Sequence, residues 1–156
     1  RFGYAYVNFG NPVSVRQHCA DAGVNFARLE RAARFGEVEK LANRLMDAIR
    51  QVVPALPVSL VAAVLLKAHP QGLHAAEVQE QVNQYTAELE RCGAHVYLSP
   101  QNRVESILNA LNMLQLRKLV GESDGVYWAI PDEVNVLTYY ANAIAHWGQL
   151  ANGSNH

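Results

Sequence analysis

The sequence has few cysteines and no long hydrophobic run. Cys19 and Cys92 are far apart, form no C-x-x-C motif and follow no secretory signal sequence, so a reduced intracellular protein without a structural disulfide is expected. The longest apolar run, residues 58–66, is interrupted only by Ser59 and is much shorter than the roughly 20 residues of a membrane-spanning helix. The sequence therefore predicts neither a disulfide-rich secreted scaffold nor a transmembrane protein.

Familiar catalytic and metal-binding motifs are also lacking. The chain contains no H-E-x-x-H, no G-x-S-x-G and no glycine-rich phosphate loop. Among its histidines, His69 and His74 bracket a Pro-Gln-Gly turn, and His18 has only Asp21 close by in the sequence, a pairing that usually has no function. The residues therefore predict no catalytic, cofactor-binding or metal-binding side chain, and no cofactor.

The net charge of the whole chain is only −1, but the two parts of the chain differ in charge. Residues 1–56 hold eight Lys and Arg against five Asp and Glu, a balance of +3, whereas residues 57–156 hold five against nine, a balance of −4. Arg28, Arg31 and Arg34 recur at every third residue and predict one basic side of a helix, which could contact phosphate groups of a lipid surface or a nucleotide. An ordinary solvated helix face explains the same spacing, so both interpretations stay open.

What is present is ordinary globular composition, with 50% hydrophobic and 17% charged residues in a chain of 156, enough for one hydrophobic core. The aromatic and β-branched residues 4–9 predict a strand. Ser14 and Gln17 form a capping-box pattern that opens a short helix, and Gly23 is suited to end it.

Helical periodicity dominates the rest of the chain. Residues 26–53 read as a helix with Gly36 as a potential break, and residues 58–68, apolar nearly all round, predict the helix at the centre of the core. A further helix is expected over residues 74–92, followed by a short strand at residues 95–98.

The last third of the chain predicts two more helices and a hairpin. Ser99 and Pro100 open a helix that continues over residues 103–116, residues 118–130 form the hairpin, and Pro131 begins the final helix. The predicted fold is thus mostly α, a helical bundle with a short β-hairpin in a winged-helix-like arrangement, preceded by a left-over strand.

A winged-helix module that binds DNA or a protein is one functional hypothesis for this order of elements. Against DNA binding, residues 57–156 carry a balance of −4, and the third helix offers only Arg103, Arg117 and Lys118. We therefore expect no nucleic-acid partner.

The strand at residues 4–9 has no sheet to join, because the other strand candidates are short and lie near the opposite end of the chain. Its sheet is expected upstream of Arg1. The predicted organisation is the end of an upstream domain over residues 1–25, a helical C-terminal domain over residues 26–150, and a disordered tail over residues 151–156. The exposed strand could also pair with a second copy of the chain.

Four stretches, taken in order, resemble the glycerol-3-phosphate acyltransferases. They are YVNFGNPV at residues 6–13, LANRLMDAI at residues 41–49, PVSLVAAVLL at residues 57–66 and VLTYYANAIAHW at residues 136–147. The related dihydroxyacetone-phosphate acyltransferases share the last pattern. The resemblance implies a parent enzyme, associated with the cytoplasmic face of a membrane, that moves an acyl group from acyl-CoA or acyl carrier protein to glycerol 3-phosphate. It makes the upstream domain an α/β acyltransferase domain and the natural partner of this chain.

The family's catalytic signature, a histidine followed five residues later by an aspartate, is not found in this sequence. The residues five positions after the first five histidines are Gly23, His74, Gln79, Pro100 and Ala151, and His156 ends the chain. The resemblance therefore assigns no catalytic residue, and the chain is expected to be a non-catalytic portion.

Overall fold

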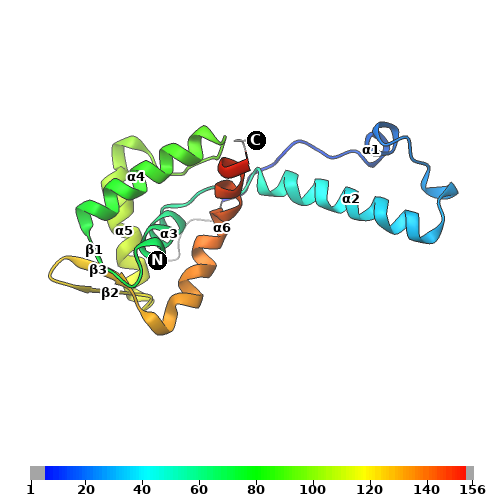
Figure 1. Cartoon of the computed structure of the whole chain (residues 1–156). Coiled ribbons are helices and arrows are strands. Elements are labelled where there is room, and N and C mark those ends of the chain that lie inside the picture. The colour runs from blue at the N-terminus through cyan, green and yellow to red at the C-terminus, as the bar shows by residue number, and fades with distance from the viewer. Residues whose placement is uncertain (1–5, 154–156) are drawn as a thin grey trace. The chain divides into compact units, whose positions relative to one another are not determined.

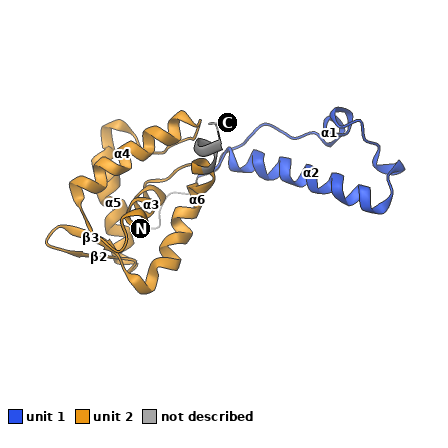
Figure 2. Cartoon of the chain, in the orientation of Figure 1, with its two compact units in different colours: residues 1–53 blue, residues 54–156 orange. Residues whose placement is uncertain are grey.

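The computed structural model describes the backbone of residues 6–153 and the side chains of residues 6–148. Its contacts divide the chain into two compact units, residues 1–53 and residues 54–156, hereafter unit 1 and unit 2 (Figure 2). The division falls immediately before Pro54. The domain boundary expected at residue 25 stays a prediction. Each unit is described by itself.

Residues 6–53 of unit 1 form two α-helices and a 3-10 turn (Figure 1). They are α1 (Val15–Asp21), η1 (Phe26–Arg28) and α2 (Arg31–Arg50). The Ser14 hydroxyl accepts from the Gln17 amide at 3.2 Å and caps α1, as predicted. Gly23 then adopts a φ of +63°, the left-handed conformation that suits a residue just beyond a helix end.

The single helix expected over residues 26–53 is interrupted, and not at Gly36. Leu29 and Glu30 have extended backbones with ψ of 137° and 154°, and they separate η1 from α2, whereas Gly36 lies inside α2. The Asn25 side chain accepts from the Ala27 amide at 3.0 Å, which favours a separate local turn there over continuous helix.

The prediction of a strand over residues 4–9 is wrong for residues 6–9, the part of it that the structure describes. Residues 6–9 have no strand conformation, and residues 4 and 5 lie outside the described residues. A strand needs a partner for its backbone hydrogen bonds, and no strand occurs among the described residues of unit 1. The Asn8 side chain instead donates to the Val52 carbonyl at 2.9 Å. The proposed pairing of copies through this strand stays a prediction.

Unit 2 is built around α3 (Pro57–Ala68), as the sequence predicts for its most apolar helix. Ser59, Leu60, Val61, Ala62, Val64 and Leu65 are all buried there. The helices packed on α3 are α4 (Ala75–Arg91), α5 (Arg103–Leu116) and α6 (Val134–Gly153). The hydrophobic core of the described residues begins at Ala55 and ends at Trp147, so all of it lies in unit 2.

The predicted hairpin is confirmed, and the sheet has a further strand. The strands β1 (Leu73–His74), β2 (Val120–Ser123) and β3 (Val126–Ala129) form an antiparallel sheet in the order β1-β3-β2. Asp124 and Gly125 connect β2 to β3 with φ of 52° and 79°, the combination of a tight two-residue hairpin turn. A two-residue strand such as β1 leaves almost no sequence signal.

Other local expectations are corrected. Residues 95–98 make only an isolated parallel bridge, Ala55 with Val96, rather than a strand. The turns η2 (Pro100–Asn102) and η3 (Pro131–Glu133) precede α5 and α6. The helix α6 continues through Gly153, and residues 154–156 lie outside the described residues. The disordered tail expected over residues 151–156 stays a prediction.

Candidate functional site

The histidines are the first candidates for acid-base chemistry, and those that the structure describes lie in both units. His18 lies in α1, His69 follows the end of α3, His74 precedes α4, and the His95 carbonyl accepts from the Ala55 amide at 2.8 Å. None of these four is found in an ion pair with a carboxylate in the described part of the chain. The His146 ring lies 5.1 Å from that of its neighbour Trp147.

Among the histidines that the structure describes, His18 is the one that is buried, and its surroundings do not resemble an acid-base pair. Its Nε2 atom is buried without a hydrogen-bond partner. Asp21, three residues further on, accepts from the Gln17 side-chain amide at 2.6 Å and lies 3.6 Å from the Arg44 guanidinium. The carboxylate that could orient the imidazole is thus engaged by other groups, so a structural role for His18 fits best.

The three arginines predicted to share one side of a helix are not on one continuous helix. Arg28 ends η1, whereas Arg31 and Arg34 lie in the first turn of α2. The Arg31 guanidinium lies 5.8 Å from the centre of the Phe35 ring, and Arg34 donates to the Leu29 carbonyl at 3.1 Å. All three arginines are exposed, so phosphate contact stays a prediction for them.

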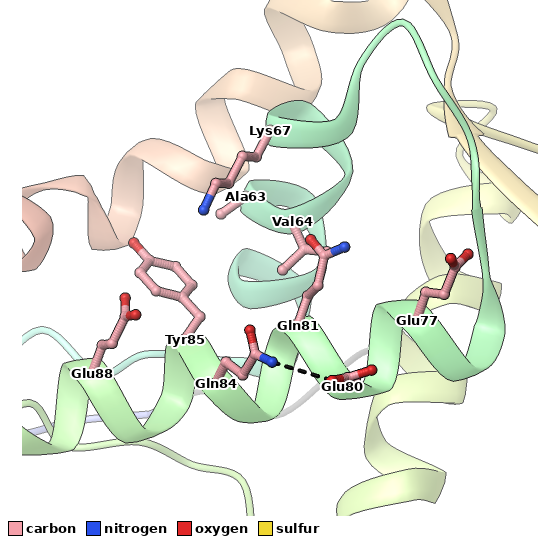
Figure 3. A pocket seen from close by; sticks show the side chains of 9 residues that line it. All are labelled: Ala63, Val64, Lys67, Glu77, Glu80, Gln81, Gln84, Tyr85 and Glu88. Atoms are coloured by element: carbon pink, nitrogen blue, oxygen red, sulfur yellow. Dashed lines mark hydrogen bonds between the residues drawn. The ribbon is translucent and has the colours of Figure 1, made fainter.

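A groove of about 680 Å³ runs between α3 and α4 in unit 2 (Figure 3). It is lined by Ala63, Val64 and Lys67 of α3 and by Glu77, Glu80, Gln81, Gln84, Tyr85 and Glu88 of α4. One lysine faces three glutamates, so the groove is polar and net negative. Because the groove is net negative, it is unsuited to binding the phosphate of glycerol 3-phosphate.

Tyr85 is the one described residue whose acidity is clearly shifted by its surroundings. Burial, and to a smaller degree the nearby Glu88 carboxylate, raise the pKa of its hydroxyl above the usual value of 10.0. The hydroxyl therefore stays protonated at neutral pH and can act as a hydrogen-bond donor. A phenol with a raised pKa is a poor general base, which argues against a catalytic role for this groove.

A second hollow, of about 580 Å³, lies within unit 1 between residues 11–13 and α2. Its cations are each matched by a nearby acid, since Lys40 lies 2.6 Å from Glu37 and Arg44 lies 3.6 Å from Asp21. This pairing leaves little positive charge for a phosphate ligand.

The third helix of unit 2 does not resemble a DNA-reading helix. Its exposed side carries apolar residues, with Val104 54% and Leu116 85% exposed. Arg117, just beyond the helix, stacks on the Tyr140 ring and bonds to its hydroxyl. Unit 2 holds five Lys and Arg against nine Asp and Glu, a balance opposite in sign to the one that favours duplex binding, and the absence of a nucleic-acid partner stays a prediction.

Within residues 6–148 there is no group of three or more His, Cys, Asp or Glu side chains placed to hold a metal ion. Among the helices described, none combines the length and the apolar character needed to cross a bilayer.

The family of the chain follows from comparison with known proteins. Residues 1–149 match the family described as the C-terminal region of glycerol-3-phosphate acyltransferase. The chain belongs to this family. The matched range contains all four stretches on which the resemblance was based, and that prediction is confirmed.

Named relatives agree with this family. The glycerol-3-phosphate acyltransferase of Shewanella frigidimarina (strain NCIMB 400) is 29% identical over 157 residues, covering 93% of this chain and 19% of that protein. The glycerol-3-phosphate acyltransferase of Pseudoalteromonas translucida (strain TAC 125) is 26% identical over 155 residues, with the same coverage. The chain thus spans about a fifth of the length of these acyltransferases. No solved structure matches the chain.

Two features of the described surface went unnoticed in the sequence. The groove between α3 and α4 depends on how the helices pack, which residue spacing does not specify. The exposed apolar side of α2 was readable in part, because Leu45 and Ile49 recur at helical spacing, but the same spacing is typical of a buried face.

Proposed function

We propose that this chain is the non-catalytic C-terminal portion of a glycerol-3-phosphate 1-O-acyltransferase. The parent enzyme would be membrane-associated, at the cytoplasmic face, and would transfer an acyl group from acyl-CoA or acyl carrier protein to glycerol 3-phosphate in phospholipid synthesis. The observation that carries the proposal is the family match over residues 1–149, together with the one-fifth share of the relatives' length. A dihydroxyacetone-phosphate acyltransferase is the close alternative.

The distribution of the histidines supports a non-catalytic role. Acyl transfer to a hydroxyl needs a positioned general base, most often a histidine oriented by a carboxylate. The sequence has no histidine followed five residues later by an aspartate. His18, the buried histidine of unit 1, has no partner at its Nε2 atom. The base would therefore come from the acyltransferase part of the polypeptide, the proposed partner of this chain.

The proposal is tested at two lengths of polypeptide. We expect the purified 156-residue chain to form no lysophosphatidate from acyl-CoA and glycerol 3-phosphate above the uncatalysed rate. We expect the complete reading frame that carries this sequence to encode an upstream histidine and aspartate at the five-residue spacing and to catalyse the reaction. The matched control is the complete protein with that histidine replaced by alanine. Turnover by a verified 156-residue species would contradict the non-catalytic assignment.

A winged-helix interaction module is the second candidate, favoured by one observation. The order α3, β1, α4, α5, β2, β3, with β3 central in the sheet, is that expected of such a module. The acidic balance of unit 2 favours a protein over DNA as its partner. Fluorescence anisotropy with duplex DNA is expected to show no submicromolar binding at physiological salt; tight binding that weakens steeply with added salt would favour a DNA-binding function instead.

A further inference from the structure

One side of α2 is apolar and is not covered by the rest of unit 1. Phe35, Val38, Ala42, Leu45, Met46 and Ile49 lie along it, and we call these six residues the α2 stripe. At 3.6 residues per turn, steps of three and four keep them on one side of the helix. The five large side chains are between 42% and 63% exposed. The stripe is therefore a continuous hydrophobic surface about four turns long.

The rest of unit 1 does not supply a core for this helix. No residue of α2 is buried, and His18 is the only buried residue among residues 6–53. By contrast, six of the twelve residues of α3 are buried. Since helices in proteins are stabilised mainly by packing of their apolar faces, α2 has the pattern of a packed helix without the packing.

We infer that the α2 stripe docks on an apolar surface of the acyltransferase part of the same polypeptide. This inference rests on the proposed function. In the relatives, the matched region is C-terminal and is 19% of the protein, so most of the acyltransferase is separate from it. A surface tethered in the same chain is present at an effective concentration on the order of millimolar, which favours it over any partner that must diffuse to the stripe.

The charges on α2 favour a protein surface over a lipid surface as the docking partner of the stripe. Helices that lie on membranes are rich in Lys and Arg on the polar side. Over its whole length α2 carries five cations and three anions, namely Arg31, Arg34, Lys40, Arg44, Arg50, Glu37, Glu39 and Asp47, and the two cations in excess are counted with the first turn. Beyond the first turn the polar side is balanced, which is typical of a helix packed on protein with its other side in water.

The first turn of α2 indicates the chemistry of the complementary surface. The Arg31 guanidinium lies over the Phe35 ring. Arg34, the other arginine of the first turn, is exposed. Both cations border the stripe at this end. The docking surface is therefore apolar with a carboxylate opposite the first turn, because that arrangement covers Phe35 and pairs the guanidinium groups.

Cysteine labelling tests the inference directly. Leu45→Cys places a thiol on the stripe, and Lys40→Cys places one on the opposite side of the same helix as the matched control. Each variant is made in the 156-residue chain and in the complete reading frame. Maleimide labelling is followed at the substituted position by peptide mass spectrometry, which separates the new thiol from native Cys19 and Cys92.

We expect the thiol of the Leu45→Cys variant to react at least roughly 10-fold more slowly in the complete protein than in the short chain. This ratio corresponds to a stripe that is covered in about nine-tenths of the molecules at any time. The control thiol of the Lys40→Cys variant should react equally fast in both lengths.

Three results would overturn the docking inference while leaving the proposed function standing, provided that the complete protein catalyses acyl transfer. The first is equal labelling of the stripe thiol in both lengths. The second is protection in the short chain that grows with protein concentration, which would identify a second copy as the occupant. The third is protection that appears only when vesicles of phosphatidylglycerol are added, which would identify a lipid surface. A complete protein without acyl transfer activity would instead remove the proposed function and the docking inference with it.

Discussion

Trp128 lies directly across Gly121 in the sheet of unit 2. The two residues are register partners on β3 and β2, and a Cβ atom at residue 121 would stand 2.5 Å from the indole Cε2 atom. The indole occupies the space that any side chain at residue 121 would need. We expect Gly121→Ala to lower the free energy of unfolding by about 1–3 kcal/mol, because the indole must leave its position.

The control for this substitution is Gly148→Ala, in α6. Apart from the backbone of α6 itself, no described atom lies within 4 Å of a Cβ atom built at residue 148, so alanine is accommodated there. Alanine restricts the unfolded chain more than glycine, and we expect stabilisation by roughly 0.5–1 kcal/mol. Urea unfolding followed by circular dichroism measures both values; a Gly121→Ala variant as stable as the wild type would show that the indole relocates freely.

Val61, at the centre of α3, is completely buried, whereas Val136 near the start of α6 is 46% exposed. Val61→Asp places a carboxylate in the core without a partner and is expected to cost more than about 4 kcal/mol, enough to unfold unit 2. The same change at Val136 should alter stability by less than about 1 kcal/mol. Thermal melting distinguishes them. A folded Val61→Asp variant would mean that α3 is not the centre of the core.

Deletion of residues 1–10 is expected to leave the melting of unit 2 unchanged. The described core begins at Ala55, and Asn8 donates its hydrogen bond to Val52, which belongs to unit 1. Differential scanning calorimetry of the full and shortened chains provides the comparison. A large fall in melting temperature would show that the first residues are integral to the stable body of the protein.

Tyr85 gives a prediction for alkaline pH. Its pKa in the folded chain is raised above 10.0, mainly by burial and secondarily by Glu88. The unfolded chain therefore loses this proton first, and stability that is fully present below about pH 10 is lost as the pH rises through the folded pKa. Tyr85→Phe should flatten this alkaline decline, measured as urea unfolding at a series of pH values. Tyr139→Phe, at a residue 77% exposed, is the control and should leave the decline intact.

Much of the fold was predictable because helix signals are local. The Ser14 cap, the apolar character of residues 57–68 and the Asp124-Gly125 turn each specify an element from a few neighbouring residues. β1 was missed because a strand of two residues depends on its pairing with β3, which lies more than 50 residues away in the sequence. The strand expected over residues 4–9 failed where described because strand propensity supplies no partner.

The functional surfaces were less predictable. The spacing of Arg28, Arg31 and Arg34 assumed a continuous helix, and the extended backbone at Leu29 and Glu30 breaks that assumption. The family resemblance was readable because four stretches retain their order along the chain. The exposure of the α2 stripe could not be predicted, since a sequence pattern shows that a helix face is apolar but does not show what covers it.

The lack of buried side chains on α2 also has a consequence for the rate at which its backbone opens. Amide hydrogens of a packed helix such as α3 exchange with solvent through global unfolding, whereas those of a helix held mainly by its own hydrogen bonds exchange through local fraying. Helix-coil relaxation takes about a microsecond or less for segments of this length. In deuterated water, α2 of the isolated chain would therefore lose its amide protons early, while α3 kept its own until the whole of unit 2 unfolded.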